Sequence, residues 1–240
     1  MLIQTYDTIR TMQLIQLAVA RGLQRWTSGV VRYDRAEKLT AKFVDLYGVN
    51  PDRAQDMRLR RAESARARLV FHPDPARLSF TWWLLVSEGA GPVVEREQLL
   101  DATDRRSRIM LRDWELLRAP KRQTREAVAW TWRLPEREFQ ARLALACAVA
   151  THESARQAQA LIAEMRAWPG FHGIAQQRRE IQEAMVGARR NAGRSDALAL
   201  PPHPPWPRLL EMRGHGTPLA VAVERMRMSV SNDQPKDGGT

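Results

Sequence analysis

The stretch Leu78–Ser87, LSFTWWLLVS, decides the fold of this chain. In an extended strand successive side chains point to opposite faces of the sheet. Phe80 and Leu84 therefore face one side, and Trp83 and Leu85 face the other. A strand that is apolar on both faces is typical of the covered middle of a sheet. We predict that elements pack against both faces here.

The residues before this strand predict a hairpin and a helix. Residues 69–72 (LVFH) form a second short strand, and the intervening PDPAR favours a turn, so the two strands should pair antiparallel. Residues 26–32 (WTSGVVR) indicate a further strand, and a helix follows over 34–48. Asp34 and Glu37 have the spacing of a capping box, and Gly48 is suited to a left-handed helix end.

The residues after it predict a short helix over 94–102 and two alternating strands over 109–118 and 128–134. Taken in order, strands and helices follow the βαββαβ pattern of the ferredoxin-like fold, with one extra strand at an edge. The predicted fold class is α+β: a ferredoxin-like antiparallel sheet followed by a C-terminal helical region. Leu99 and Leu100 should be buried.

Changes in composition and in apolar periodicity divide the chain into six expected segments. Proline-rich sequence separates a helical region from a short docking segment, and the last dozen residues lack apolar periodicity. The segments are an N-terminal helix (1–24), the ferredoxin-like domain (25–134), a helical region (135–191), a linker (192–207), a docking segment (208–228) and a disordered tail (229–240).

The charge is strongly positive, with 38 Lys and Arg against 27 Asp and Glu, a net charge of +11 over 240 residues. All but four of the basic residues are Arg, whose planar guanidinium binds phosphate and stacks on bases. Such a balance favours a polyanionic partner, either DNA or RNA. The single cysteine, Cys147, excludes a disulfide framework and a cysteine-based metal site. We expect a cytoplasmic protein with no membrane partner, no metal and no cofactor.

Basic clusters are the candidate nucleic-acid-binding surfaces, and solvated helix faces are the alternative for each. Arg178 and Arg189, like Arg179 and Arg190, are eleven residues apart, which is about three helical turns. Each pair should therefore form a stripe along one helix face. Arg68 accompanies the first cluster. The candidate residues are Arg58, Arg60, Arg61, Arg66, Arg105, Arg106, Arg108, Lys121, Arg122, Arg125, Arg178, Arg179, Arg189 and Arg190.

Tryptophan and histidine positions offer other interpretations. Trp82, Trp114 and Trp130 each follow the apolar face of a predicted strand and indicate core packing. Trp83 points away from that face and could stack on an unpaired base. His72 and His152 could act as general bases, although a surface or capping role fits them as well. No sequence motif predicts a catalytic residue.

Several stretches resemble uncharacterised basic proteins encoded on plasmids and integrative conjugative elements of proteobacteria. They are RWTSGVV (25–31), TWWLLVSEGAGP (81–92), DWELLR (113–118), AWTWRLPEREF (129–139) and PGFHGIAQQRREI (169–181). The resemblance implies a mobile-element context and assigns no residue roles.

Three hypotheses follow for the function. The first is a non-catalytic nucleic-acid-binding accessory protein of a mobile genetic element, which binds the phosphate backbone through its arginine clusters. The second is an RNA-processing, metal-independent endoribonuclease, or a backbone subunit of a CRISPR-type ribonucleoprotein, in which a histidine would be essential. The third is a protein-interaction module that uses helices 135–191. The charge distribution favours the first, with other proteins of a ribonucleoprotein or mobile-element complex as further partners.

Overall fold

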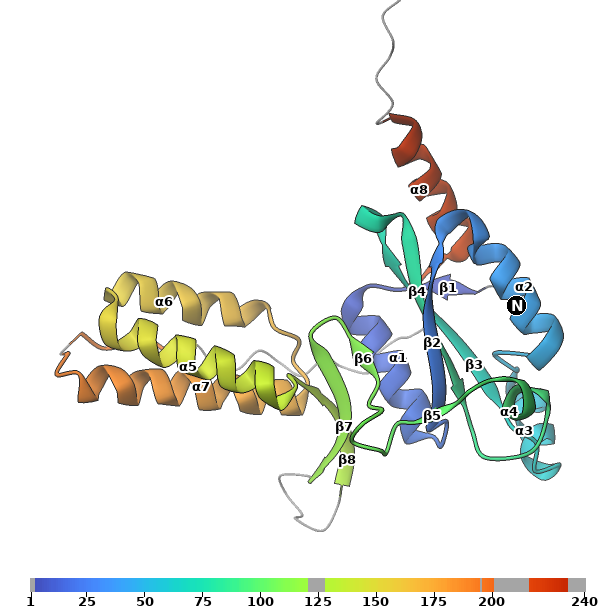
Figure 1. Cartoon of the computed structure of the whole chain (residues 1–240), viewed down its shortest axis with the longest axis horizontal. Coiled ribbons are helices and arrows are strands. Elements are labelled where there is room, and N and C mark those ends of the chain that lie inside the picture. Colours follow the sequence, from blue (N-terminus) through green and yellow to red (C-terminus); the bar gives the residue numbers. More distant parts are fainter. Residues whose placement is uncertain (1–2, 121–127, 195, 201–215, 233–240) are drawn as a thin grey trace, which may run out of the picture. The chain divides into compact units, whose positions relative to one another are not determined.

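The protein divides into two compact units in a computed structural model, which describes residues 3–120, 128–194, 196–200 and 216–232 (Figure 1). The first unit comprises Met1–Ser107 and Leu209–Thr240, and the second comprises Arg108–Arg208. The chain is a mixed α+β protein with a helical C-terminal region, as the sequence predicts. Within the described residues no helix is both long and apolar enough to cross a membrane.

The first unit is built on a six-stranded mixed sheet with the strand order β5-β2-β4-β3-β1-β9. Only β1 and β3 pair in parallel, and every other neighbouring pair is antiparallel. The elements are β1 (Gln4–Thr5), α1 (Thr8–Ala20), β2 (Arg25–Arg32), α2 (Ala36–Tyr47), α3 (Arg53–Arg61), β3 (Ala67–Asp74), β4 (Ser79–Val86), α4 (Pro92–Arg96), β5 (Leu100–Asp101), β9 (Thr217–Pro218) and α8 (Leu219–Asn232), with 3-10 turns at Tyr33–Arg35 and Pro75–Arg77.

Strand β4 is the covered central strand that its sequence predicts. Trp83, Leu84 and Leu85 are all buried, and β4 pairs with β3 and β2 on its two sides. The face that carries Leu84 packs with Phe43 of α2 and with Val223 of α8 in one hydrophobic core. Helix α1 packs on the opposite face (Figure 1). Strand β9 pairs with β1, and α8 contributes Leu219, Val223 and Met226 to this core.

Two predicted local features of the first unit are wrong. Asp34 does not cap α2: a 3-10 turn precedes this helix, and the Asp34 carboxylate instead accepts hydrogen bonds from Arg32. The helix predicted over 94–102 ends at Arg96, and the chain then extends into β5, where Leu100 is 47% exposed. Gly48 does end α2 in the left-handed conformation.

The second unit combines a three-stranded sheet, of order β6-β7-β8, with three helices. Its elements are β6 (Met110–Leu111), β7 (Trp114–Pro120), β8 (Val128–Arg133), α5 (Glu136–His152), α6 (Ala155–Glu164), a 3-10 turn at Met165–Ala167 and α7 (His172–Asn191). Strands β7 and β8, which correspond to the two alternating segments of the sequence, pair antiparallel. Residues 109–118 contain a turn at Arg112, where φ is positive, and therefore form two strands instead of one.

This second sheet is the main departure from the prediction. Residues 109–118 do not join the first sheet, so the ferredoxin-like topology predicted with them is not completed there. Local packing explains the difference. Trp132 of β8 is fully buried and its ring lies 6.5 Å from that of Phe171, and the Gln177 side chain of α7 bonds the backbone of Leu134 at both its nitrogen and its oxygen. These contacts attach the hairpin to the helices of its own unit.

Helix α7 begins against β8 at a position that only glycine can occupy. The Gly173 amide donates to Thr131 Oγ1 at 3.0 Å, and a Cβ at Gly173 would lie 2.6 Å from the carbonyl oxygen of Trp132. From there the predicted apolar stripe, Ile174, Ile181 and Met185, is buried along the helix. The hairpin and helices of the second unit thus share one core.

Candidate anion-binding site

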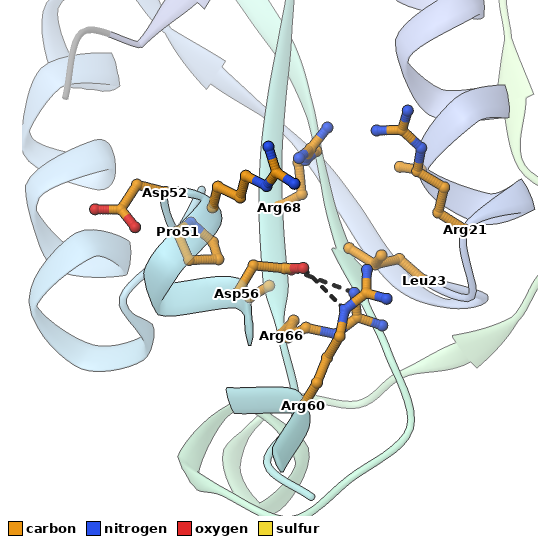
Figure 2. Close-up of a pocket in the computed structure, with 11 residues that line it drawn as sticks. Arg21, Leu23, Pro51, Asp52, Asp56, Arg60, Arg66 and Arg68 are labelled. Carbon is orange, nitrogen blue, oxygen red and sulfur yellow. Dashed lines mark hydrogen bonds and ion pairs between the residues drawn. The ribbon is translucent and has the colours of Figure 1, made fainter. Parts of the chain in front are cut away.

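A cavity of about 260 Å³ lies in the first unit between the end of α1, helix α3 and the first residues of β3 (Figure 2). Local sequence fixes this arrangement. Pro51 precedes α3, and the Asp52 side chain accepts from the Gln55 amide while Gln55 Oε1 accepts from the Asp52 amide, which completes a capping box. Helix α3 therefore starts beside the cavity.

Arginine dominates the lining of this cavity, which we call the arginine pocket. Five arginines line it and only two carboxylates do, and one of these, Asp52, already caps α3. The arginines come from the end of α1 and from two neighbouring parts of the chain far from it in sequence, α3 and the start of β3. The charged lining residues are Arg21, Arg53, Arg60, Arg66, Arg68, Asp52 and Asp56.

Asp56 neutralises two of these arginines. Its two carboxylate oxygens lie 2.9 Å from Arg60 Nε and 3.3 Å from Arg66 Nη1 (Figure 2). Burial alone would raise the pKa of Asp56, but the hydrogen bond and charge of Arg66, with those of Arg60, lower it overall. Asp56 is therefore ionised at neutral pH and holds Arg60 and Arg66 at one wall of the pocket.

Arg21 and Arg68 have no such partner: among the described residues, neither guanidinium forms an ion pair with a carboxylate. Figure 2 shows the two side chains reaching into the same space from α1 and β3. Burial lowers the pKa of Arg68, and the positive charge of Arg21 lowers it further. Two like charges are therefore held close together, and the more distant Asp56 carboxylate offsets part of their effect on the pKa of Arg68.

This arrangement is suited to binding an oxyanion. Guanidinium groups present planar sets of N–H donors that match the oxygens of phosphate or carboxylate, and a partly buried site strengthens each contact. An anion between Arg21 and Arg68 would also relieve their mutual repulsion. Within the described ranges, no three His, Cys, Asp or Glu side chains come together in a group that could hold a metal ion.

The structure brings some predicted residues to this pocket and places others elsewhere. Arg60 and Arg66 line it, and Arg58 and Arg61 are exposed on the same helix. Arg105 and Arg106 are exposed in the turn after β5. Arg108 belongs to the second unit, where it bonds buried Glu115 at 2.8 Å together with Arg133 at 3.0 Å. Lys121, Arg122 and Arg125 lie outside the described residues.

One of the two arginine pairs predicted as a surface stripe on α7, Arg178 and Arg189, is wrong as a solvent-facing surface. Arg178 and Arg189 are each only 2% exposed, on the buried side of the helix. Arg189 donates to the carbonyl oxygens of Ala150 and Glu153, at 3.0 and 3.2 Å, and pairs with the Asp196 carboxylate. Arg179 is half-buried and Arg190 is exposed. The two members at the inner face thus belong to the interior of the second unit and cannot follow a phosphate backbone.

Trp83 and His72 are both buried in the first unit. Trp83 is 2% exposed beneath α1, so it cannot stack on a base. His72 is buried, with Nδ1 at 3.1 Å from the carbonyl oxygen of Tyr6 and 3.4 Å from Thr11 Oγ1. This contact connects β3 to the start of α1. His152 is exposed, and its carbonyl oxygen accepts from Arg194 at the end of the helical region.

Sequence reasoning missed Arg21 and Arg53 as site residues. Each is a single arginine outside the dense clusters, and the pocket forms only when the end of α1 meets α3 and β3. Arg68 was within a cluster, but its place on a strand next to buried Ala67 and Leu69 was the more informative signal. The comparisons with known proteins found no match: no family model, curated protein or solved structure resembles this chain significantly.

Proposed function

We propose that the protein binds nucleic acid without catalysis, through phosphate contacts centred on the arginine pocket. The observation that carries this proposal is the pair Arg21 and Arg68, two converging guanidinium groups with no carboxylate partner among the described residues. Exposed Arg58 and Arg61 on α3 extend the positive surface beside the pocket. The net charge of +11 adds a long-range attraction for the same kind of partner.

The environment of His72 favours binding over RNA cleavage. A general base must reach the substrate proton directly or through one water, whereas His72 is buried and its Nδ1 contacts the Tyr6 carbonyl oxygen and the Thr11 hydroxyl. The resemblance to proteins of conjugative elements supports an accessory role in such an element. Other proteins of that complex would be further partners.

The topology of the first sheet supports a relation to the ferredoxin-like fold. Strand β4 lies between β2 and β3, which run parallel and are connected by α2 and α3, as in a split βαβ unit. In this proposal α4 and β5 are the short remnants of the second helix and last strand. Sheets of this kind serve many functions, so the function rests on the pocket and not on the fold.

A salt titration of binding tests the proposed function. We expect the wild-type protein to bind a fluorescently labelled oligonucleotide with an affinity that falls steeply as salt rises, because each phosphate contact releases a counter-ion. In an Arg21→Gln/Arg68→Gln variant, the slope of log K against log salt should decrease by about 2, and affinity should fall by about tenfold.

The matched control removes the same charge from the other unit. Arg137 and Arg156 are exposed on α5 and α6 and form no ion pair within the described part of the chain. The Arg137→Gln/Arg156→Gln variant should bind with nearly the wild-type slope. Equal losses in the two double variants would show that net charge alone attracts the oligonucleotide and would contradict a role for the pocket.

A further inference from the structure

A second, smaller cavity of about 190 Å³ adjoins the arginine pocket in the first unit. Arg68 lines both cavities, so one residue borders the two spaces. The second cavity, which we call the Tyr6 pocket, differs in character. Its lining includes Tyr6 with apolar Leu14, Leu69 and Val70. A cavity lined mainly by charged side chains and a cavity of mixed lining with an aromatic residue therefore share one arginine.

Two polar side chains of the Tyr6 pocket, Tyr6 and Asn50, are already bonded within the protein. The Tyr6 hydroxyl donates to Gln4 Oε1 at 2.8 Å. The Asn50 carboxamide bonds the backbone of Leu69 twice, accepting from its amide at 3.1 Å and donating to its carbonyl at 3.2 Å. The other lining residues include four apolar side chains beside aromatic Tyr6, a composition that suits stacking better than base-specific hydrogen bonding.

We propose that the two pockets together bind one unpaired nucleotide of a single-stranded nucleic acid, with its phosphate at Arg68 and Arg21 and its base against Tyr6. This inference rests on the proposed function and specifies its substrate class. A phosphate and its own base are joined through one sugar, which matches two compartments that share a single residue. Burial raises the pKa of Tyr6 and the charge of Arg68 acts in the opposite direction, which places the phenol within electrostatic reach of the arginine.

The arrangement selects single strands over duplexes. In a duplex the bases are paired in the interior, and only the backbone is available to the arginine pocket. A single strand can turn a base outward and stack it on an aromatic ring, and such stacking tolerates any base because every base has a π-face. Binding should therefore prefer single strands and show little sequence dependence.

The experiment compares a 12-nucleotide single strand with the 12-base-pair duplex by fluorescence anisotropy, at one salt concentration. The test variant is Tyr6→Leu, which keeps an apolar side chain and removes the ring, and the control is Tyr6→Phe, which keeps the ring. The wild type should bind the single strand more tightly. Tyr6→Leu should weaken single-strand binding about tenfold and leave duplex binding unchanged, and Tyr6→Phe should bind as the wild type does.

Each outcome bears on one of the two proposals. A circular-dichroism melting curve for each variant first establishes that the first unit remains folded, since the Tyr6 ring also packs against Gly216. Equal loss of single-strand and duplex binding in Tyr6→Leu, or equal binding of both by the wild type, would overturn the nucleotide site but leave the phosphate site standing. Absence of binding to either oligonucleotide would overturn the proposed function, and this inference with it.

Discussion

Arginines of the first and second units occupy opposite environments, although both groups come from helix-rich, strongly basic sequence. Arg68 has no ion-pair partner within the described residues and lines a pocket that an anion can enter. Arg178 also lacks a partner there, but it lies on the buried stripe of α7 between Ile174 and Ile181. Burial lowers the pKa of both. The comparison teaches that the residues packed around an arginine decide whether it lines a cavity or lies in the interior. Its spacing in the sequence does not decide this.

A second contrast lies within α7 itself. Arg189 is buried, and its guanidinium donates hydrogen bonds to carbonyl oxygens and to a carboxylate. Arg178 is equally buried, and its Nη1 and Nη2 have no hydrogen-bond partner in the described structure. Removing one partner of a buried ion pair lowers the free energy of unfolding, because the other partner stays buried without a bond. A buried charge that has no partner lowers this free energy through its own desolvation. The two residues should therefore respond to the same substitution with opposite signs.

The largest expected effect is that of Arg189→Met. The substitution leaves the carbonyl oxygens of Ala150 and Glu153 without their donor and removes the link to Asp196. We expect a loss of about 3 kcal/mol in the free energy of unfolding of the second unit, measured by denaturant titration. Its neighbour Arg190 is exposed, so Arg190→Met should change this free energy by less than about 0.5 kcal/mol. Similar losses in both variants would contradict the structural role of Arg189.

The next effect has the opposite sign. Arg178→Met keeps an unbranched apolar stem and removes two buried nitrogens that have no acceptor within the described residues. We expect the free energy of unfolding to rise by about 1 kcal/mol, because the desolvation cost of the unpaired guanidinium disappears. Thermal melting at neutral pH measures it. A clear drop in melting temperature would mean that Arg178 has a partner that its buried position does not reveal.

The smallest effect concerns the carboxylate of the arginine pocket. The folded-state pKa of Asp56 is lowered, so its stabilising contribution is present above its ordinary pKa, near 3.8, and is lost as pH falls through the folded-state value. Melting temperatures of the wild type and Asp56→Asn should differ slightly at pH 7, by the equivalent of less than about 1 kcal/mol, and should converge below pH 4. Exposed Asp45 forms no ion pair among the described residues, so Asp45→Asn should leave the melting temperature at pH 7 unchanged.

Asp56→Asn also tests the arginine pocket of the first unit through its effect on oligonucleotide affinity. The variant releases Arg60 and Arg66 from their carboxylate and leaves one aspartate, Asp52, against five arginines in the pocket. Oligonucleotide affinity should rise by about twofold to threefold at low salt, and the gain should disappear as salt screens the added charge. Weaker binding would indicate that Asp56 is needed to orient Arg60 and Arg66 for phosphate.

The sequence predicted local structure well where one periodic pattern dominates. The hairpin of β3 and β4 formed where the apolar pattern places it, and Gly48 ends α2 as predicted. Predictions failed where two local options compete. Asp34 has a cap-like spacing to Glu37, but its carboxylate pairs with adjacent Arg32, and a 3-10 turn forms in place of the cap.

The site was only partly predictable. The sequence of α7 already contained evidence against a solvent-facing position of Arg178 and Arg189. Arg178 is four residues after Ile174 and three before Ile181, and Arg189 is four after Met185. These spacings place both arginines on the apolar face of the helix. The arginine pocket had no equivalent signal, because Arg21, Arg53 and Arg68 are brought together only when three separate elements pack.

By itself the sequence determined the α+β class, the central apolar strand, the helices of the C-terminal region and an excess of arginine over acid. These follow from local propensity, periodicity and composition, which act within one element at a time. Only the tertiary structure decided which sheet each strand joins. It also decided which arginines line a pocket and which lie in the interior. Those outcomes depend on contacts between residues far apart in the chain, where the desolvation of each arginine is set by the elements that surround it.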